Sequence, residues 1–371
     1  MKAKEKAKQL LAASEHIGRA LASRLSAWLV HWGSRPGGQL PSLPGLAWFL
    51  RLPSGLAQLP GGLRLWISLL SLGFLLAALV GNGQQLLMIR LEAQAWCWLA
   101  LAVGVSLLSL VVNGLAWGVI LGQLGLKPRW QPIVANYLTS NLRKYLPGGI
   151  WHLAQRVQLL RGEDAPMEQP ASASRALLAV LLDPLLAAIA ALALVALGGW
   201  QGGLGGLALL PLLALHPRWL TPLLLRLERR EAQRLDIKVN SSGQQTLAAT
   251  PWRSLLALLA FVLTRFAGFA CCLQALELTN SLAWNDWLAS FALAWTVGLV
   301  VPAAPGGAGI FEATLLLRLA GALPEAQLLA VAISYRLVVT IADLIAAGAA
   351  RWDLRQLRQN QAGRSIEASA E

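Results

Sequence analysis

The sequence predicts an all-α polytopic membrane protein, and three observations lead to that fold class. Apolar residues make up 56% of the 371 residues, whereas charged residues make up only 13%. Several runs rich in Leu, Ala and Val approach the roughly 20 residues that a helix needs to cross a bilayer. The short segments between these runs are rich in Lys and Arg, as cytoplasmic loops of membrane proteins commonly are.

The first part of the chain differs from the rest. Residues 1–35 combine Lys2, Lys4, Lys6 and Lys8 with apolar residues at roughly helical spacing, which is typical of an amphipathic helix on an anionic leaflet. A disordered basic tail is the alternative. We expect this basic amphipathic segment to be followed by a Pro/Gly-rich linker (36–64), a transmembrane domain (65–350) and a basic cytoplasmic tail (351–371).

We expect about six apolar runs to span the membrane, with tryptophans near several of their ends, because indole rings favour the headgroup level. These runs are Leu65–Met88, Trp96–Leu121, Ala176–Gly198, Gly203–Leu225, Trp252–Leu276 and Gln327–Ala350. Two further apolar stretches, Pro132–Leu160 and Trp287–Leu323, each contain Pro-Gly-Gly near the middle. Proline removes a helical N–H and glycine permits a tight turn. Each stretch is therefore expected to form a helical hairpin that enters and leaves the membrane on one side.

The loop charges predict an orientation. Placing the Lys-rich N-terminus in the cytoplasm puts nearly all loop cations inside, with both termini cytoplasmic and the protein in the plasma (inner) membrane. Each half of the chain then consists of two spans, a hairpin and a further span. The first half starts in the cytoplasm and the second half starts on the external side of the membrane. Because the two hairpins would enter from opposite faces, we expect an inverted-repeat architecture, in which sites commonly lie near the midplane.

Several other classes of function are not indicated. The net charge of +13 does not predict nucleic-acid binding, because the cations lie between apolar runs rather than in one patch. Cys97, Cys271 and Cys272 show no C-x-x-C spacing and the four histidines are scattered, so we expect no metal and no cofactor. The acids within spans are single and show no catalytic cluster. A non-enzymatic function is therefore favoured, with a membrane-embedded transferase for a lipid-linked substrate as an alternative.

The two breaks predict a cationic substrate site. The helix after each break points its positively polarised N-terminus into the membrane, where it attracts anions. The candidate substrate-binding residues are Arg143, Lys144, Gly148, Gly149, His152 and Arg156 around the first break, and Gly306, Gly307, Glu312 and Arg336 around the second. A charge at mid-depth costs about 2.5–3.5 kcal/mol on insertion scales and usually has a role. The alternative is that Arg143, Lys144 and Arg156 extend to the cytoplasmic interface.

The remaining charges within apolar segments are expected to form buried pairs, and the candidates are Asp183, Arg265 and Asp343. Arg336 and Asp343 are seven residues apart on one helix face, so one expectation pairs them with each other. Arg265 would find its partner in Asp183, Glu312 or Asp343. Glu312 has two interpretations, since a carboxylate in the first turn complements the helix dipole, or it holds an arginine of the site or a cationic group of the substrate.

The second-half stretch "VPAAPGGAGIFEATLLLRLAGALPEAQLLAVAISYRLVVTIADL" resembles the transmembrane, flippase-like region of the lysylphosphatidylglycerol synthase family. That family typically has Pro-Gly-Gly-x-Gly-x-x-Glu, then a Gly, then an Arg-Leu pair in the next helix. The corresponding positions are Pro305, Gly306, Gly307, Gly309, Glu312, Gly321, Arg336 and Leu337. The first-half stretch "NYLTSNLRKYLPGGIWHLAQR" is similar to the family's first hairpin, and the resemblance covers roughly Leu65–Ala350.

The resemblance implies a flippase-like translocator of an anionic lipid or of a polyprenyl-phosphate-linked substrate. Family members with a soluble synthase domain make an aminoacylated phospholipid and flip it across the membrane. We expect no such domain here and no aminoacyl transfer, because only about twenty residues follow the last expected span. Relatives made of the membrane region alone are in some cases associated with polyprenyl-linked sugars. A non-transporting partner subunit of a glycosyltransferase is therefore a further alternative.

Overall fold

The computed structural model describes residues 92–145, 151–162, 165–198, 250–301 and 309–370, together with Gly307 and short pieces between 208 and 227. All of them belong to one compact unit, Leu59–Glu371. In these residues the regular structure is helical, with no β-strand beyond two isolated bridges. The expected all-α membrane fold is confirmed.

Four described helices are long and apolar enough to cross a membrane. They are α5 (Ala93–Gln123), α8 (Ala173–Val195, extended by the 3₁₀ turn η3, Ala196–Gly198), α11 (Trp252–Ala275) and α14 (Glu325–Ala370). These correspond to four of the six expected spans. The expected span Leu65–Met88 lies outside the described residues, and Gly203–Leu225 is described only in short pieces, among them α9 (Leu210–Leu213). In the segment expected as a tail, α14 continues as a helix to Ala370.

Shorter helices occupy the two stretches expected to form hairpins. The first contains α6 (Trp130–Asn141), the 3₁₀ turn η2 (Leu142–Tyr145) and α7 (Trp151–Arg161), and the second contains α12 (Trp284–Val300) and α13 (Ile310–Arg318). At 12, 11, 17 and 9 residues, the four α-helices fall below the length of a crossing. Gly307, at the second break, has a φ of 71°, a conformation that glycine adopts without steric cost.

The two ends of the first hairpin are joined to each other. The Arg129 N–H donates to the Pro166 carbonyl at 2.9 Å, and the Glu168 N–H donates to the Lys127 carbonyl at 3.2 Å. An exposed ion pair of 2.8 Å connects the Lys127 and Glu168 side chains, and its hydrogen bond and charge raise the pKa of Lys127. The chain therefore returns to the end of α5 from which the hairpin began.

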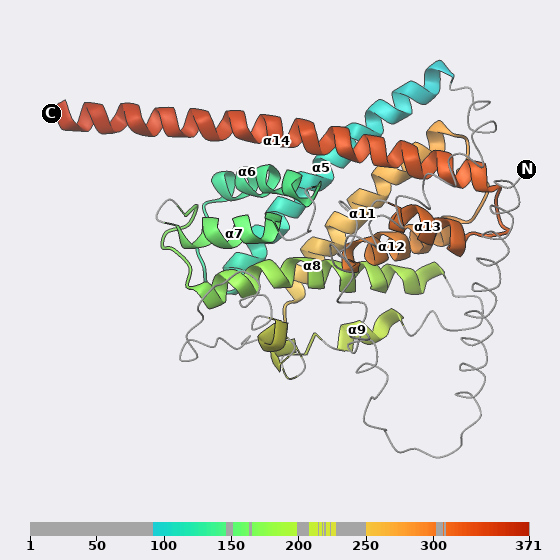
Figure 1. Cartoon of the computed structure of the whole chain (residues 1–371), viewed down its shortest axis with the longest axis horizontal. Coiled ribbons are helices and arrows are strands. Elements are labelled where there is room, and N and C mark those ends of the chain that lie inside the picture. Colours follow the sequence, from blue (N-terminus) through green and yellow to red (C-terminus); the bar gives the residue numbers. More distant parts are fainter. Residues whose placement is uncertain are drawn as a thin grey trace, which may run out of the picture. The chain divides into compact units, whose positions relative to one another are not determined.

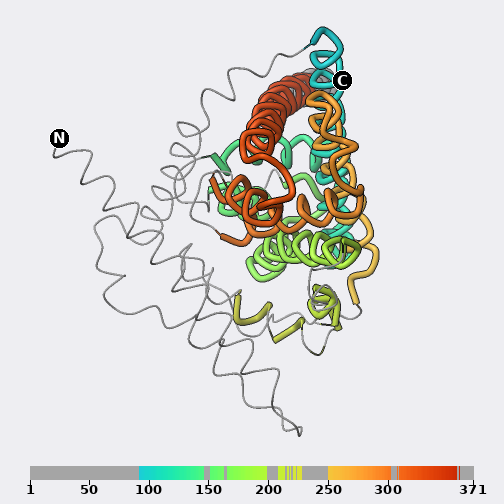
Figure 2. Tube along the Cα trace, turned by 90° about the vertical axis from the view of Figure 1, so that its right-hand side faces the viewer, coloured from blue at the N-terminus to red at the C-terminus, as the bar shows by residue number. Residues whose placement is uncertain are grey.

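The helices pack in a pattern that repeats between the two halves (Figures 1 and 2). Along one side α5 and α11 lie next to each other, and the two hairpins lie between α8 and α14. The first arm of each hairpin packs on the last span of the other half, α6 on α14 and α12 on α8. The second arm packs on the last span of its own half, α7 on α8 and α13 on α14. A two-fold relation between the halves would produce this exchange of partners.

Aromatic residues form the core between the second hairpin and its neighbours. Phe269 of α11, Phe291 of α12, Phe311 of α13 and Tyr335 of α14 are all buried, with ring centroids 5.1–6.3 Å apart. Aromatic pairs at such distances add roughly 0.5–1.5 kcal/mol each beyond the burial of their area. The cluster therefore fixes α13 and α12 firmly against α11 and α14.

Gly198 provides a test of the contact between η3 and α12. A Cβ at this position would meet the Cβ of Ala289 and lie 2.7 Å from the carbonyl oxygen of Asn285, and backbone atoms cannot move aside easily. We expect Gly198→Ala to lower the free energy of unfolding by about 1–3 kcal/mol, measured by thermal unfolding in detergent. The matched control is Gly104→Ala, where nothing lies within 4 Å of the new Cβ. Equal stability of the two variants would contradict this packing.

The opposite orientation of the two hairpins can be tested by labelling. In a variant without its native cysteines, Glu168→Cys and Glu277→Cys place single thiols at exposed positions beside the first and second hairpin, respectively. The inverted repeat predicts that a membrane-impermeant maleimide reacts with Cys at 168 only from the cytoplasmic side, and with Cys at 277 only from outside. Labelling of both from one side contradicts the inverted repeat.

Candidate functional site

A cavity of about 340 Å³ lies where the two hairpins meet the four described spanning helices. Helices α5, α6, α7, α8, α11, α12, α13 and α14 all contribute side chains to its lining. Its charged residues are Lys144, Arg156, Asp183, Arg265 and Arg336. The volume is at the lower end of the range for small-molecule sites, so the cavity fits a small polar group rather than a large headgroup.

The first buried ion pair joins the second arm of the first hairpin to α8. Arg156 Nη1 lies 3.0 Å from Asp183 Oδ2, and the two side chains are only 2% and 7% exposed. The same Asp183 oxygen accepts a hydrogen bond of 2.9 Å from the Tyr137 hydroxyl, and Arg156 Nε donates to Ser140 Oγ at 3.0 Å. The guanidinium also lies 3.7 Å from the Tyr137 ring centroid. These contacts compensate both charges and hold α7 to α6 and α8.

The second ion pair has the opposite arrangement of charges. Here the acid is on the hairpin and the arginine is on the span, with Arg336 Nε 2.6 Å from Glu312 Oε1. Arg336 Nη2 also donates to the carbonyl of Gly307 at the break. Glu312 is 1% exposed, so the pair joins α13 to α14 in the interior. Glu312 therefore pairs with an arginine that lines the cavity, and its place in the first turn of α13 also complements the helix dipole.

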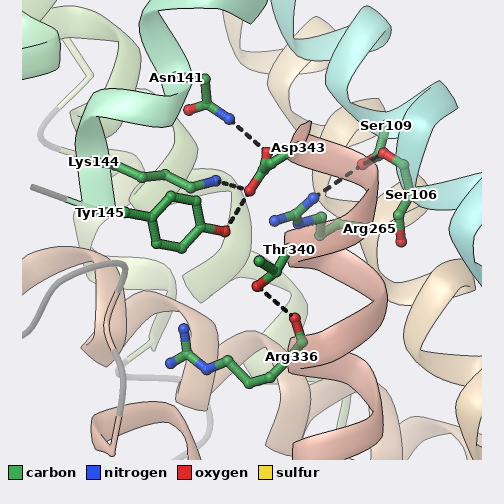
Figure 3. Close-up of polar contacts among 9 residues, drawn as sticks. All are labelled: Ser106, Ser109, Asn141, Lys144, Tyr145, Arg265, Arg336, Thr340 and Asp343. Atoms are coloured by element: carbon green, nitrogen blue, oxygen red, sulfur yellow. Dashed lines mark hydrogen bonds and ion pairs between the residues drawn. The ribbon is translucent and has the colours of Figure 1, made fainter. Parts of the chain in front are cut away.

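Asp343 of α14 accepts three bonds from the first hairpin (Figure 3). Lys144 Nζ lies 2.6 Å from Oδ2, the Tyr145 hydroxyl donates to the same oxygen at 2.5 Å, and Asn141 Nδ2 donates to Oδ1 at 2.9 Å. All three donors lie at the end of the first arm, just before the break. We call this group the Asp343 clasp, because it fastens the first hairpin to the last span of the other half.

Arg265, near the middle of α11, differs from the other three cations. It is 6% exposed, and its hydrogen bond goes to Ser109 Oγ of α5 at 3.3 Å (Figure 3). The Ser109 hydroxyl itself donates to the Ser106 carbonyl, which leaves its lone pairs for the arginine. No carboxylate among the described residues forms an ion pair with Arg265.

The structure brings together most of the residues that the sequence predicted. Lys144, His152, Arg156, Gly307 and Arg336 line the cavity, and Glu312 lies behind Arg336. Arg143 is exposed and does not line it. Three predicted glycines, Gly148, Gly149 and Gly306, lie outside the described residues.

The expected charge pairs were partly wrong. Arg336 and Asp343 share a helix face but pair with Glu312 and Lys144 instead, because those partners project from the hairpins onto α14. Asp183 lies in a buried ion pair, but with Arg156 rather than with Arg265, the partner considered from the sequence. Among the described residues Arg265 forms no direct ion pair with any of the three candidate acids, each of which is paired with another cation, although Asp343 still acts on it electrostatically.

Aromatic residues of the site were mostly overlooked. The sequence contains only three tyrosines, and all three, Tyr137, Tyr145 and Tyr335, line the cavity. Tyrosine is rare in this apolar chain, and two of the three tyrosines lie in the first arm of the first hairpin. These two facts are a signal that could have identified them. Asn113 of α5 also lines the cavity and had no comparable signal.

The pair of Arg156 and Asp183 yields a prediction about stability. Removing one partner of a buried pair leaves an uncompensated charge, which costs about 3–5 kcal/mol. We therefore expect Arg156→Gln and Asp183→Asn each to lower the thermal unfolding midpoint markedly. The double variant, with neither charge, should recover most of the loss. Additive losses in the double variant would show that the two side chains do not interact.

The comparisons with known proteins agree with this fold. No curated protein matches the chain. The model of one family, described as the lysylphosphatidylglycerol synthase TM region, matches residues 63–347, which include both hairpin stretches, α5, α8, α11 and the part of α14 up to residue 347. The chain is an integral membrane protein and belongs to the family of the lysylphosphatidylglycerol synthase transmembrane region.

Proposed function

We propose that the protein translocates an anionic lipid, or a polyprenyl-phosphate-linked substrate, from one leaflet to the other. The observation that carries this proposal is the cavity between the hairpins, whose charged lining consists of four cations and one acid. Buried cations in a membrane interior need counter-charges, and an anionic headgroup provides one. Membership of a family named for lysylphosphatidylglycerol synthase supports lipid as the class of substrate.

The lining also has apolar residues suited to a lipid. Leu299 of α12 borders the cavity and is 37% exposed, so the lining includes an apolar side chain that also reaches the protein surface. In the proposed mechanism the headgroup occupies the cavity while the acyl or prenyl tails stay in the hydrocarbon region. This arrangement avoids moving the tails through a polar environment, which would forfeit their hydrophobic stabilisation.

Both hairpins are fastened to α14, and this supports a mechanism of alternating access. The Asp343 clasp holds the first hairpin, and the pair of Arg336 and Glu312 holds the second. Release of one fastening would open the cavity beside that hairpin while the other stays closed. In the proposed inverted repeat, with both termini in the cytoplasm and the protein in the plasma membrane, the two openings face opposite compartments.

A leaflet-exchange assay tests the proposal. The purified chain is reconstituted into liposomes that contain a fluorescent anionic phospholipid, and a reductant that quenches only the outer leaflet reports the exchange. We expect faster exchange than in empty liposomes. Lys144→Ala and Arg336→Ala should slow it about tenfold or more, since each removes a charge-assisted contact. Arg253→Ala, at an exposed position at the start of α11, is the matched control.

Unchanged exchange across a panel of anionic, zwitterionic and prenyl-phosphate lipids would overturn the proposal. Chemical conversion of any of these lipids by the purified protein would favour the transferase alternative. If the Lys144 and Arg336 variants support a normal phenotype in cells, a non-transporting partner of a glycosyltransferase would be the better explanation.

A further inference from the structure

Arg265 is a buried cation whose charge is not neutralised by an ion pair within the described residues. Its hydrogen bond to Ser109 Oγ is long, at 3.3 Å, and its Nε atom has no hydrogen-bond partner in the part of the chain that the structure describes. The group borders the cavity and is 6% exposed. A charge in a low-dielectric interior carries a large desolvation penalty. The acid that acts electrostatically on Arg265, Asp343, is already ion-paired with Lys144, so this arginine can take a further anion from the cavity that it faces.

Other polar atoms that have no hydrogen-bond partner among the described residues surround the same cavity. Arg156 Nη2 and the Tyr335 hydroxyl are donors, and Asn113 Oδ1 and His152 Nδ1 can accept. Arg156 and Tyr335 are 2% and 4% exposed. Buried polar groups in native proteins are almost always hydrogen-bonded. The set therefore fits a ligand that has an anionic oxygen for the arginines and a donor group, such as a hydroxyl, for Asn113.

The charges of the site determine how many negative charges the ligand carries. Lys144, Arg156 and Arg336 are each paired with one acid, Asp343, Asp183 and Glu312 respectively. Arg265 is the fourth cation, so the described network has a surplus of one positive charge. A phosphodiester carries one negative charge, whereas a phosphomonoester carries about 1.5 to 2 at neutral pH.

We infer that Arg265 anchors a singly charged phosphodiester, the headgroup phosphate of the translocated lipid. The choice of a lipid rests on the proposed function, whereas the anion site rests on the buried arginine and the charge balance. A phosphomonoester or a diphosphate would bring more negative charge than the site can neutralise, and the excess would be buried. The site thus selects by charge as well as by size.

Four ligands of matched structure test this inference on the detergent-solubilised full chain. They are dihexanoyl phosphatidylmethanol (a lipid phosphodiester), dihexanoyl phosphatidic acid (the phosphomonoester), dihexanoylglycerol (no phosphate) and dimethyl phosphate (the diester without tails). Binding is measured as the shift of the thermal unfolding midpoint at about pH 8, well above the second pKa of a phosphomonoester, about 6. We expect phosphatidylmethanol to bind most tightly and dihexanoylglycerol to have no effect.

Variants of Arg265 assign the binding to this side chain. Arg265→Gln should weaken phosphatidylmethanol binding by about tenfold to a hundredfold, the loss expected for a charge-assisted hydrogen bond. Arg265→Lys keeps the charge and should retain most of the affinity. Arg253→Gln, on the same helix but exposed, should bind as the wild type does. Wild-type affinity in Arg265→Gln would overturn the inference.

The stability of the ligand-free protein provides an independent measurement. Because Arg265 has no ion-pair partner, Arg265→Gln should have an unfolding midpoint no lower than that of the wild type. Arg156→Gln, which strands Asp183, should have a clearly lower one. A drop of several degrees in Arg265→Gln would mean that the arginine has a structural counter-charge and would overturn the inference.

The remaining outcomes separate the parts of the argument. Tighter binding of phosphatidic acid than of phosphatidylmethanol would overturn the charge balance, and equal binding of dimethyl phosphate would assign the site to a soluble phosphodiester. If the wild type exchanges lipid and Arg265→Gln does so equally fast, this inference fails and translocation stands. If the wild type binds phosphatidylmethanol through Arg265 but exchanges no lipid, translocation fails and the anion site stands.

Discussion

The pairing of charges away from water is the constraint on which the arrangement of this protein depends. An isolated ion is strongly disfavoured in an interior of low dielectric constant, and a pair is tolerated only with good geometry and additional hydrogen bonds. Each of the three buried ion pairs has additional hydrogen bonds, and each joins two different helical elements. The charges therefore act as fastenings that specify where each hairpin lies. Because α14 supplies Arg336 and Asp343, about two turns apart on one face, a single helix determines the position of both hairpins.

The hairpins are possible only because the surrounding helices shield them. A helix that stops inside a membrane leaves backbone groups without partners, and these cannot face lipid. At the second break the Gly307 carbonyl receives a bond from Arg336, so the cation that pairs with Glu312 also satisfies the backbone. The site thus arises from the same requirement as the fold: groups exposed by the break need polar partners, and those partners surround a cavity. The cavity lies where the broken helices meet, and the uninterrupted spans α5 and α11 form its opposite wall.

The sequence predicted the positions of the spanning helices well, because length and hydropathy determine them. It predicted the partners of the charged residues less well, because these depend on how the helices pack. Helix α11 begins at Trp252, as expected, and ends at Ala275, one residue from the expected end, because a long apolar run leaves few alternatives in a membrane. The predicted partner of Asp343 was wrong, because spacing along a helix shows which residues share a face but not which element packs against that face. Arg336 is close in sequence, yet Lys144, about two hundred residues away, reaches the carboxylate because α6 packs on α14. That Arg265 forms no ion pair of its own among the described residues becomes clear only when the partners of Asp183, Glu312 and Asp343 are known.

The two halves use the same fastening with exchanged charges, and they differ in what else holds each hairpin. The first hairpin is held by a buried ion pair on α8 and by the Asp343 clasp on α14, so its described contacts with the last spans depend strongly on charge. The second has one ion pair, and its helices are also embedded in the aromatic cluster of Phe269, Phe291, Phe311 and Tyr335. An anion that enters the cavity competes with Asp343 for Lys144 and with Glu312 for Arg336, because both cations line the cavity. It has no comparable effect on aromatic packing, which is insensitive to a nearby charge of that kind. The attachment of the first hairpin to the last spans therefore depends on charge at both of its described fastenings, whereas the second hairpin keeps its aromatic packing when its ion pair is released.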